Sequence, residues 1–126
     1  MATNALLGSG AIVLDCPDPA ALAGFYATVL GWPAATITHG GAWATLVNPA
    51  GGLRIEFQRA ADYRPPTWPD PTRPQMCHFD LEVSDLSAAA REVLAAGATA
   101  LDLSADHPTF QVYADPAGHP FCLCAC

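Results

Sequence analysis

The two halves of this chain carry the same order of segments, and this internal repeat is the feature that most restricts its fold. The stretch AIVLDCPDPAALAGFYATVLGW at 11–32 is echoed by HFDLEVSDLSAAAREVLAAGA at 78–98. In each stretch an apolar strand leads to an aspartate, Asp18 or Asp85, at the place where a helix would be capped. Apolar residues then recur at spacings of three and four before a glycine. Each half therefore predicts a strand followed by an amphipathic helix.

Three short strands are predicted after the helix in each half. They cover 35–38, 43–47 and 53–57 in the first half, and 99–103, 110–115 and 120–124 in the second. Related turns, NPAGG at 48–52 and DPAGH at 115–119, precede the last strand. Each half is thus a βαβββ module, and the sequence predicts an α+β fold built from two tandem modules.

A proline-rich segment separates the two modules. We expect a single domain over 1–126 that comprises a module at 1–58, a linker at 59–75 and a module at 76–126. The linker holds five prolines, and a stiff extended spacer is the simplest interpretation. Trp68 in its middle does not suit a spacer, and we expect this indole to pack over the mouth of a pocket or against another subunit.

Composition narrows the class of protein. The formal net charge is −7, and all five basic residues are arginines. This balance argues against nucleic acid as a partner and slightly favours a cationic or neutral ligand. The chain has no apolar run of the roughly 18 residues that a membrane helix needs, and no basic start typical of a signal peptide, so a cytoplasmic protein is expected. The spacing of its five cysteines matches neither a zinc CxxC pair nor a disulfide scaffold.

Alternation along the strands divides each sheet into two faces. The apolar face is expected to pack on the module's own helix. The opposite face carries ionisable groups and thiols, which are Arg54, Glu56, His78, Asp80, Glu82, Cys122, Cys124 and Cys126. A one-sided solvated sheet would also explain the charges, but cysteine is among the most buried residue types. We therefore expect this second face to line a half-buried cleft.

Several motifs resemble the vicinal oxygen chelate superfamily, which includes glyoxalase I, extradiol dioxygenases and bleomycin-resistance proteins. They are D-x6-FY-x3-LGW from Asp18 to Trp32, LRIEF, HFDLEV and DPAGHPF. The chain is most similar to the glyoxalase-like branch. The resemblance implies paired curved mixed sheets around a central cleft, with helices on the outer faces, and a homodimer.

The resemblance also implies positions for a divalent metal. Metal enzymes of the superfamily use one ligand from the first and one from the last strand of each module. These positions hold Ala11, Glu56, His78 and Cys122 here, where the family pattern is His, Glu, His, Glu. Ala11 offers no ligand atom. Glu56, His78 and Cys122 plus water would suit zinc, whereas magnesium or manganese would reject the thiol. We expect a metal-free pocket in which Glu56 pairs with His78, with a divalent metal as the alternative.

Two main hypotheses for function follow, with a structural or regulatory module as a third. The first is a small-molecule-binding protein, including drug resistance by sequestration. The second is a lyase, isomerase or epimerase acting on a small carbonyl compound, with Glu56 as general base and His78 or a metal polarising the oxygen. Trp43 and Tyr113 either line the pocket or fill the core. The expected ligand-binding residues are Trp43, Arg54, Trp68, Asp80, Tyr113 and Cys122.

Overall fold

The computed structural model describes residue 5 and residues 10–125 and has an α+β architecture. The first half contains β1 (Ala11–Cys16), α1 (Pro19–Leu30), β2 (Thr36–Thr38), a short 3-10 helix (His39–Gly41), β3 (Trp43–Leu46) and β4 (Arg54–Arg59). The second half contains β5 (Phe79–Glu82), α2 (Leu86–Ala96), β6 (Thr99–Asp102), β7 (Phe110–Ala114) and β8 (Pro120–Cys124). Both halves therefore have the predicted order of elements.

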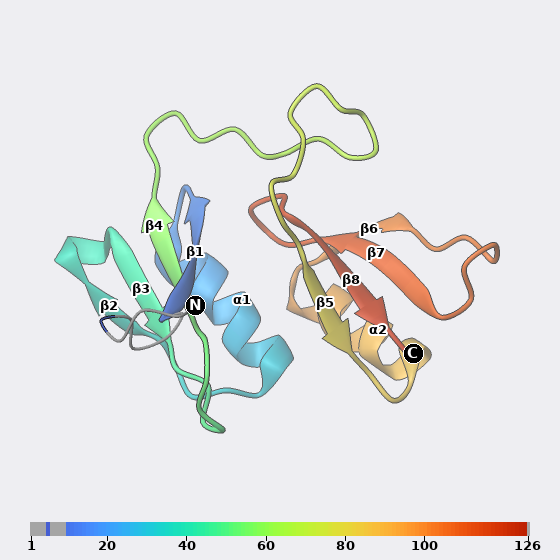
Figure 1. The fold of residues 1–126 in the computed structure, drawn as a ribbon, viewed down its shortest axis with the longest axis horizontal. Helices are drawn as coiled ribbons and strands as arrows, with labels where there is room; N and C mark the ends of the chain where they lie inside the picture. The colour runs from blue at the N-terminus through green and yellow to red at the C-terminus, as the bar shows by residue number, and fades with distance from the viewer. Residues whose placement is uncertain (1–4, 6–9, 126) are drawn as a thin grey trace.

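The two modules form separate four-stranded mixed sheets of the same topology (Figure 1). The strand orders are β1-β4-β3-β2 and β5-β8-β7-β6, with one parallel pair in each sheet. The register repeats as well, because Val13 lies opposite Glu56 in the first sheet just as Asp80 lies opposite Cys122 in the second. Glu56 and Cys122 are thus equivalent positions of the two modules, as the repeat predicts.

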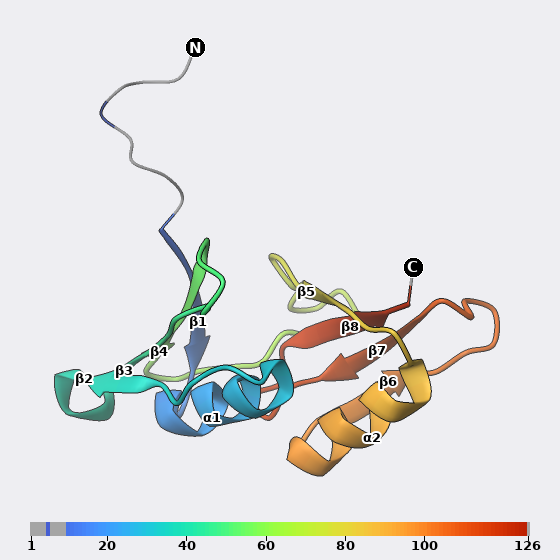
Figure 2. The ribbon, with the colours of Figure 1, turned by 90° about the horizontal axis from the view of Figure 1, so that it is seen from below.

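Local sequence signals place both helices. The side chains of Asp18 and Asp85 each accept a hydrogen bond from a backbone N–H of the first turn at 3.2 Å. Gly31 and Gly97 end the helices in the left-handed conformation, which glycine adopts without steric cost. Each helix covers one face of its own sheet, and the opposite faces stay open (Figure 2).

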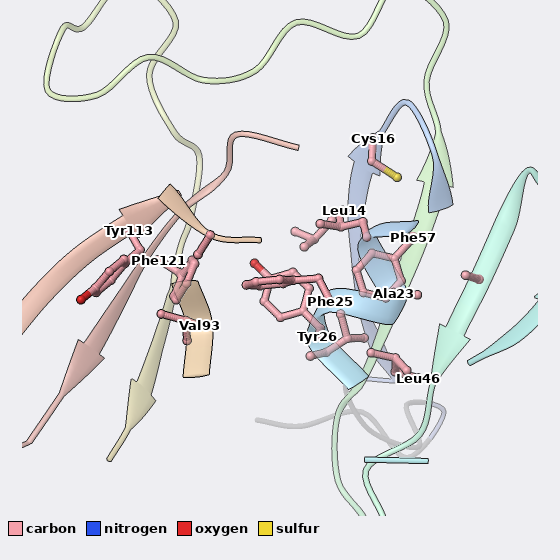
Figure 3. Close-up of a cluster of buried hydrophobic side chains, with 14 of the residues drawn as sticks. Leu14, Cys16, Ala23, Phe25, Tyr26, Leu46, Phe57, Val93, Tyr113 and Phe121 are labelled. Atoms are coloured by element: carbon pink, nitrogen blue, oxygen red, sulfur yellow. The ribbon is translucent and has the colours of Figure 1, made fainter. Parts of the chain in front are cut away.

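An aromatic cluster joins the two modules. Phe25 and Tyr26 of α1 lie between the sheets (Figure 3). The Tyr26 ring stacks on Phe57 of the first sheet at 6.0 Å and meets the edge of Phe79 of the second at 5.6 Å. Phe25 contacts Phe121 of β8 at 5.9 Å. Because of these contacts α1 belongs to the core of both modules. Burying aromatic side chains of this size is a large source of stability.

Buried polar contacts reinforce this junction. The Tyr26 hydroxyl donates to the Asp115 carboxylate at 2.6 Å, and Asp115 is only 3% exposed. Burial raises the pKa of Asp115, although hydrogen bonds from Tyr26 and from backbone N–H groups oppose this rise. His119 Nε2 lies 2.7 Å from the backbone oxygen of Asp15, so the imidazole N–H donates across the modules. The turn at 115–119 is therefore fixed to the first module.

The linker folds into a closed loop instead of an extended spacer. Thr67 and Arg73 pair through their backbones at 2.7 Å, and Arg73 Nε donates to the Pro65 oxygen at 2.9 Å. Tyr63 donates to the Ala117 oxygen at 2.8 Å, which ties the segment to the second module. Trp68 is half-buried in this loop. Trp68 lines a pocket together with residues of the second sheet.

None of the helices in the described part of the chain has the length and apolar character needed to cross a bilayer.

Cys122 and Cys124 share the open face of β8, while Phe121 and Leu123 are buried on the helix side. Cys126, which was expected on the same open face, lies outside the described residues.

Candidate functional site

Three chemically active side chains meet on the open face of the second sheet. His78 immediately precedes β5, Asp80 lies two residues further, and Cys122 is the β8 residue in register with Asp80. His78 Nε2 is 3.2 Å from Asp80 Oδ1. Ligand atoms of all three residues lie within 4.8 Å of one another. The alternation of short strands therefore assembles an imidazole, a carboxylate and a thiol in one place.

The thiol of this group is held in its neutral form. Partial burial raises the pKa of Cys122 to about 11, and the neighbouring charge of Asp80 adds to this effect. At neutral pH the side chain is thus a weak hydrogen-bond donor and a poor nucleophile, because the thiolate is the reactive form. Cys122 is therefore suited to contacting a ligand and not to attacking it.

The linker encloses part of this face. Trp68 and Gln75 come from the linker, His78 precedes β5, and Phe110 and Cys122 come from β7 and β8. Together with Val112, Pro120 and Phe121 they line a pocket of about 170 Å³. Three aromatic residues, an imidazole, an amide and a thiol around a mainly apolar space form the kind of lining that binds small organic molecules.

Glu56 belongs to a separate group on the first sheet. Trp43 Nε1 donates to Glu56 Oε1 at 2.6 Å, and Thr45 donates to the same oxygen at 3.4 Å. Arg54 lies 3.4 Å from the other oxygen in an ion pair, and the Glu56 side chain is 15% exposed. Among the described residues no hydrogen bond or ion pair joins Glu56 to His78. Most of the expected site residues thus fall into two groups. Trp43, Arg54 and Glu56 lie on the first sheet, whereas His78, Asp80 and Cys122 lie at the second sheet with Trp68 of the linker near them.

Tyr113 belongs to neither group. It is fully buried on the helix-facing side of β7, and its hydroxyl donates to the Gln111 side chain at 2.8 Å. Its ring stacks on Phe121 at 5.9 Å. Of the two roles that the sequence left open for Tyr113, the structure places this residue in the core.

The family's metal site does not fit the residues present. Ala11 contributes no donor atom, and both oxygens of Glu56 are engaged by Trp43, Thr45 and Arg54. The one group of possible ligands found among the described residues is His78, Asp80 and Cys122, within a single sheet. A set with one protonated thiol is unsuited to magnesium or manganese and leaves zinc as the ion that these donors would accept.

Sequence reasoning missed two residues of the pocket. Gln75 was assigned only to the linker, and Phe110 only to a strand. The signal for Phe110 was available in the turn at 115–119. This turn closes the hairpin of β7 and β8, and the register of the hairpin pairs Val112 with Cys122. Phe110 is two residues from Val112 along β7, so its side chain lies on the same face. Gln75 has no comparable signal, because its position depends on how the linker folds.

This fold, with two βαβββ modules and open sheet faces, defines a member of the vicinal oxygen chelate superfamily. The chain matches the glyoxalase-like domain family over residues 11–124 and belongs to that family. No curated protein matches it.

Solved structures show the same fold at low sequence identity. A possible glyoxalase from Bacillus cereus is 14% identical with a TM-score of 0.68, and the alignment covers 95% of this chain and 100% of that chain. A glyoxalase/bleomycin resistance protein/dioxygenase family enzyme from Burkholderia phytofirmans is 16% identical with a TM-score of 0.67, covering 90% and 94%. A glyoxalase-related enzyme from Fulvimarina pelagi is 19% identical with a TM-score of 0.65, covering 94% and 88%. These similarities concern the fold alone.

Proposed function

We propose that this protein binds a small, mainly aromatic organic molecule on the open face of its second sheet. The observation that carries this proposal is the position of Trp68, which the linker sets over His78 and Cys122 to enclose the pocket. An indole in this position supplies a flat apolar wall on which a ring can stack.

The size of the pocket indicates the size of the ligand. A volume of about 170 Å³ is close to the roughly 150 Å³ of a cavity that holds one benzene molecule. A compound with a single six-membered ring therefore fits, and any larger substituent has to extend out of the pocket. Phe110 and Phe121 are further aromatic residues of the lining.

The polar groups of the pocket favour a neutral or cationic ring. His78 carries its carboxylate partner Asp80, and the protonated Cys122 thiol offers only a weak donor. The net charge of −7 acts in the same direction over longer distances. A ring with a hydroxyl, amide or amine substituent can hydrogen-bond to His78 or Asp80 while its face stacks on Trp68.

A fluorescence titration tests this proposal. A panel of single-ring compounds, comprising phenol, benzamide, benzylamine and benzoate, is titrated while tryptophan emission is recorded. We expect quenching by the first three that is lost in Trp68→Phe and retained in Trp43→Phe, which removes an indole of the first sheet. His78→Ala should weaken binding by roughly 5- to 10-fold, as expected for one hydrogen bond. No quenching by any of the four compounds in the wild-type protein refutes the proposal.

The hypothesis of a lyase or isomerase with Glu56 as base receives less support. A general base needs an oxygen that can reach the substrate proton, and both oxygens of Glu56 already have partners. His78, its expected companion, lies on the other sheet. The test of this hypothesis is Glu56→Gln, which abolishes turnover of a carbonyl substrate if Glu56 is the base and leaves it unchanged otherwise.

We also propose a homodimer in a reducing, cytoplasmic setting. The dimer is supported by the resemblance to a superfamily whose members often form dimers and by apolar side chains left exposed at the surface, such as Ile37 at 44% and Val47 at 57%. The compartment is supported by the cysteine spacing. Light scattering coupled to size exclusion gives the mass in solution, and a monomer at micromolar concentration would contradict the dimer.

A further inference from the structure

A second and larger cleft lies at the junction of β1, the linker and the start of the second module. It has a volume of about 380 Å³, within the range of small-molecule sites. Val13 and Asp15 of β1 form one side, Arg64 and Arg73 of the linker another, and His119 completes the wall. None of the residues expected to bind a ligand or a metal lines this cleft.

The cleft concentrates positive charge in an acidic protein. Arg64 and Arg73 are two of only five basic residues in the chain, and both line it. Within the described residues neither arginine lies within ion-pair distance of a carboxylate. Arg73 is oriented by its Nε bond to the Pro65 oxygen at 2.9 Å, which leaves its terminal nitrogens available for a ligand.

Other charged groups around the cleft limit the charge of the ligand. The Asp15 carboxylate is part of the wall, and Asp70 lies close enough to Arg73 for this arginine to lower the pKa of Asp70. The Nε2–H of His119 is donated to the Asp15 backbone oxygen at 2.7 Å, so this nitrogen is not available to a ligand. One or two carboxylates offset part of the positive charge of the two guanidinium groups. The charge that remains suits a ligand with one negative charge better than a ligand with two.

The rest of the lining is apolar, with one polar atom left unsatisfied. Leu14, Pro66, Pro74 and Met76 contribute hydrocarbon surface. The Oε1 atom of Gln75, which also lines the cleft, is buried and has no hydrogen-bond partner among the described residues. An unpaired buried oxygen of this kind costs about 1–3 kcal/mol, and a donor on a bound molecule would recover part of that cost.

We propose that this cleft is a separate binding site for a small organic monocarboxylate. The carboxylate is held by Arg64 and Arg73, and the hydrocarbon body lies against the apolar lining. A bound hydroxyl or amide N–H can donate to Gln75. This site does not rest on the function proposed above, because it shares only Gln75 with the pocket under Trp68.

Calorimetry with hexanoate and its neutral isostere hexanamide tests the site. We expect hexanoate to bind and hexanamide to bind at least about 10-fold more weakly, since charge-assisted hydrogen bonds to arginine contribute the difference. Arg64→Gln should weaken hexanoate binding by roughly 10-fold or more, and so should Arg73→Lys, which keeps the charge and removes the planar fork. Arg91→Gln, a change to an exposed arginine of α2, is the matched control and should change the affinity by less than about 2-fold.

Three results overturn the proposal. They are no heat of binding with hexanoate at millimolar concentration, equal affinity for hexanoate and hexanamide, and equal effects of Arg64→Gln and Arg91→Gln. Inorganic phosphate is a further probe, and binding as tight as that of hexanoate would also overturn the preference for a monocarboxylate. Quenching of Trp68 by phenol should persist in Arg64→Gln, so failure of this site and failure of the pocket under Trp68 are distinguishable.

Discussion

Gly118 allows a sharp test of how the linker is held. Its φ is +90°, and a Cβ at this position would lie 2.6 Å from Pro65 Cβ. Its equivalent in the first module, Gly51, has nearly the same conformation with φ +88°, yet a Cβ there would meet nothing within 4 Å. The two turns are otherwise alike, since each glycine N–H donates to the backbone oxygen three residues earlier, at 2.9 Å for Gly51 and 2.8 Å for Gly118.

The two alanine variants therefore separate backbone strain from the contact with the linker. Both changes force a non-glycine residue into a left-handed conformation, at a cost of about 1–3 kcal/mol. Only Gly118→Ala adds a steric overlap, which has to be relieved by moving Pro65 about 1 Å or by overpacking that costs about 1–3 kcal/mol. We expect Gly118→Ala to lose that much more unfolding free energy than Gly51→Ala.

Urea and thermal unfolding followed by circular dichroism measure this difference. In a chain of this length the excess corresponds to a Tm lower by about 4 °C per kcal/mol. Pro65→Gly removes the colliding atom, so combining it with Gly118→Ala should recover the excess in a double-mutant cycle. Equal losses for Gly118→Ala and Gly51→Ala would refute the reasoning, because they would mean that the linker does not rest on this turn.

Three further predictions concern buried or paired groups. Tyr26→Phe should cost about 1–3 kcal/mol in unfolding experiments, because it leaves one oxygen of the buried Asp115 carboxylate without its donor. Asp102→Asn should lower the NMR titration midpoint of His107. The backbone oxygen of Phe110 and the Asp102 carboxylate raise the pKa of this histidine. Its protonated form therefore stabilises the folded state. This stabilisation is fully present below about pH 6.5 and is lost as the pH rises through the raised pKa. Protein purified without added metal should contain less than about a tenth of an equivalent of divalent ion, measured by mass spectrometry, since Ala11 has no donor atom and the oxygens of Glu56 are engaged within their own sheet.

The fold could be predicted because its signals are local and occur twice. Asp18 and Asp85 cap the helices where the sequence indicated, and the related turns close equivalent hairpins. Apolar alternation predicts one face of each sheet that packs on the helix, and Phe57 and Phe121 on these faces are fully buried. Each of these features depends on neighbouring residues alone, so a single sequence is enough to identify it.

The site could be predicted only in part, because it depends on how separate segments meet. The sequence placed His78, Asp80 and Cys122 on one face, and register brings them together. It also placed Glu56 beside His78, whereas the structure holds the two on different sheets. The paired arginines of the linker cleft had no sequence signal, since nothing local indicates that residues 64 and 73 line the same space.

The two modules differ at the equivalent positions of Glu56 and Cys122, and this difference indicates which of them has polar groups available for a ligand. In the first module the Glu56 position keeps a carboxylate, but Val13 stands opposite it and Trp43 and Arg54 satisfy its oxygens. In the second module the equivalent pair is Cys122 and Asp80, with His78 beside them. Because the oxygens of Glu56 are hydrogen-bonded or ion-paired within the protein, this carboxylate stabilises its own sheet and is less able to bind a ligand. The His78 group has fewer internal partners and shares a pocket with Trp68. The function proposed above therefore assigns the binding of a small molecule mainly to the second module and the linker.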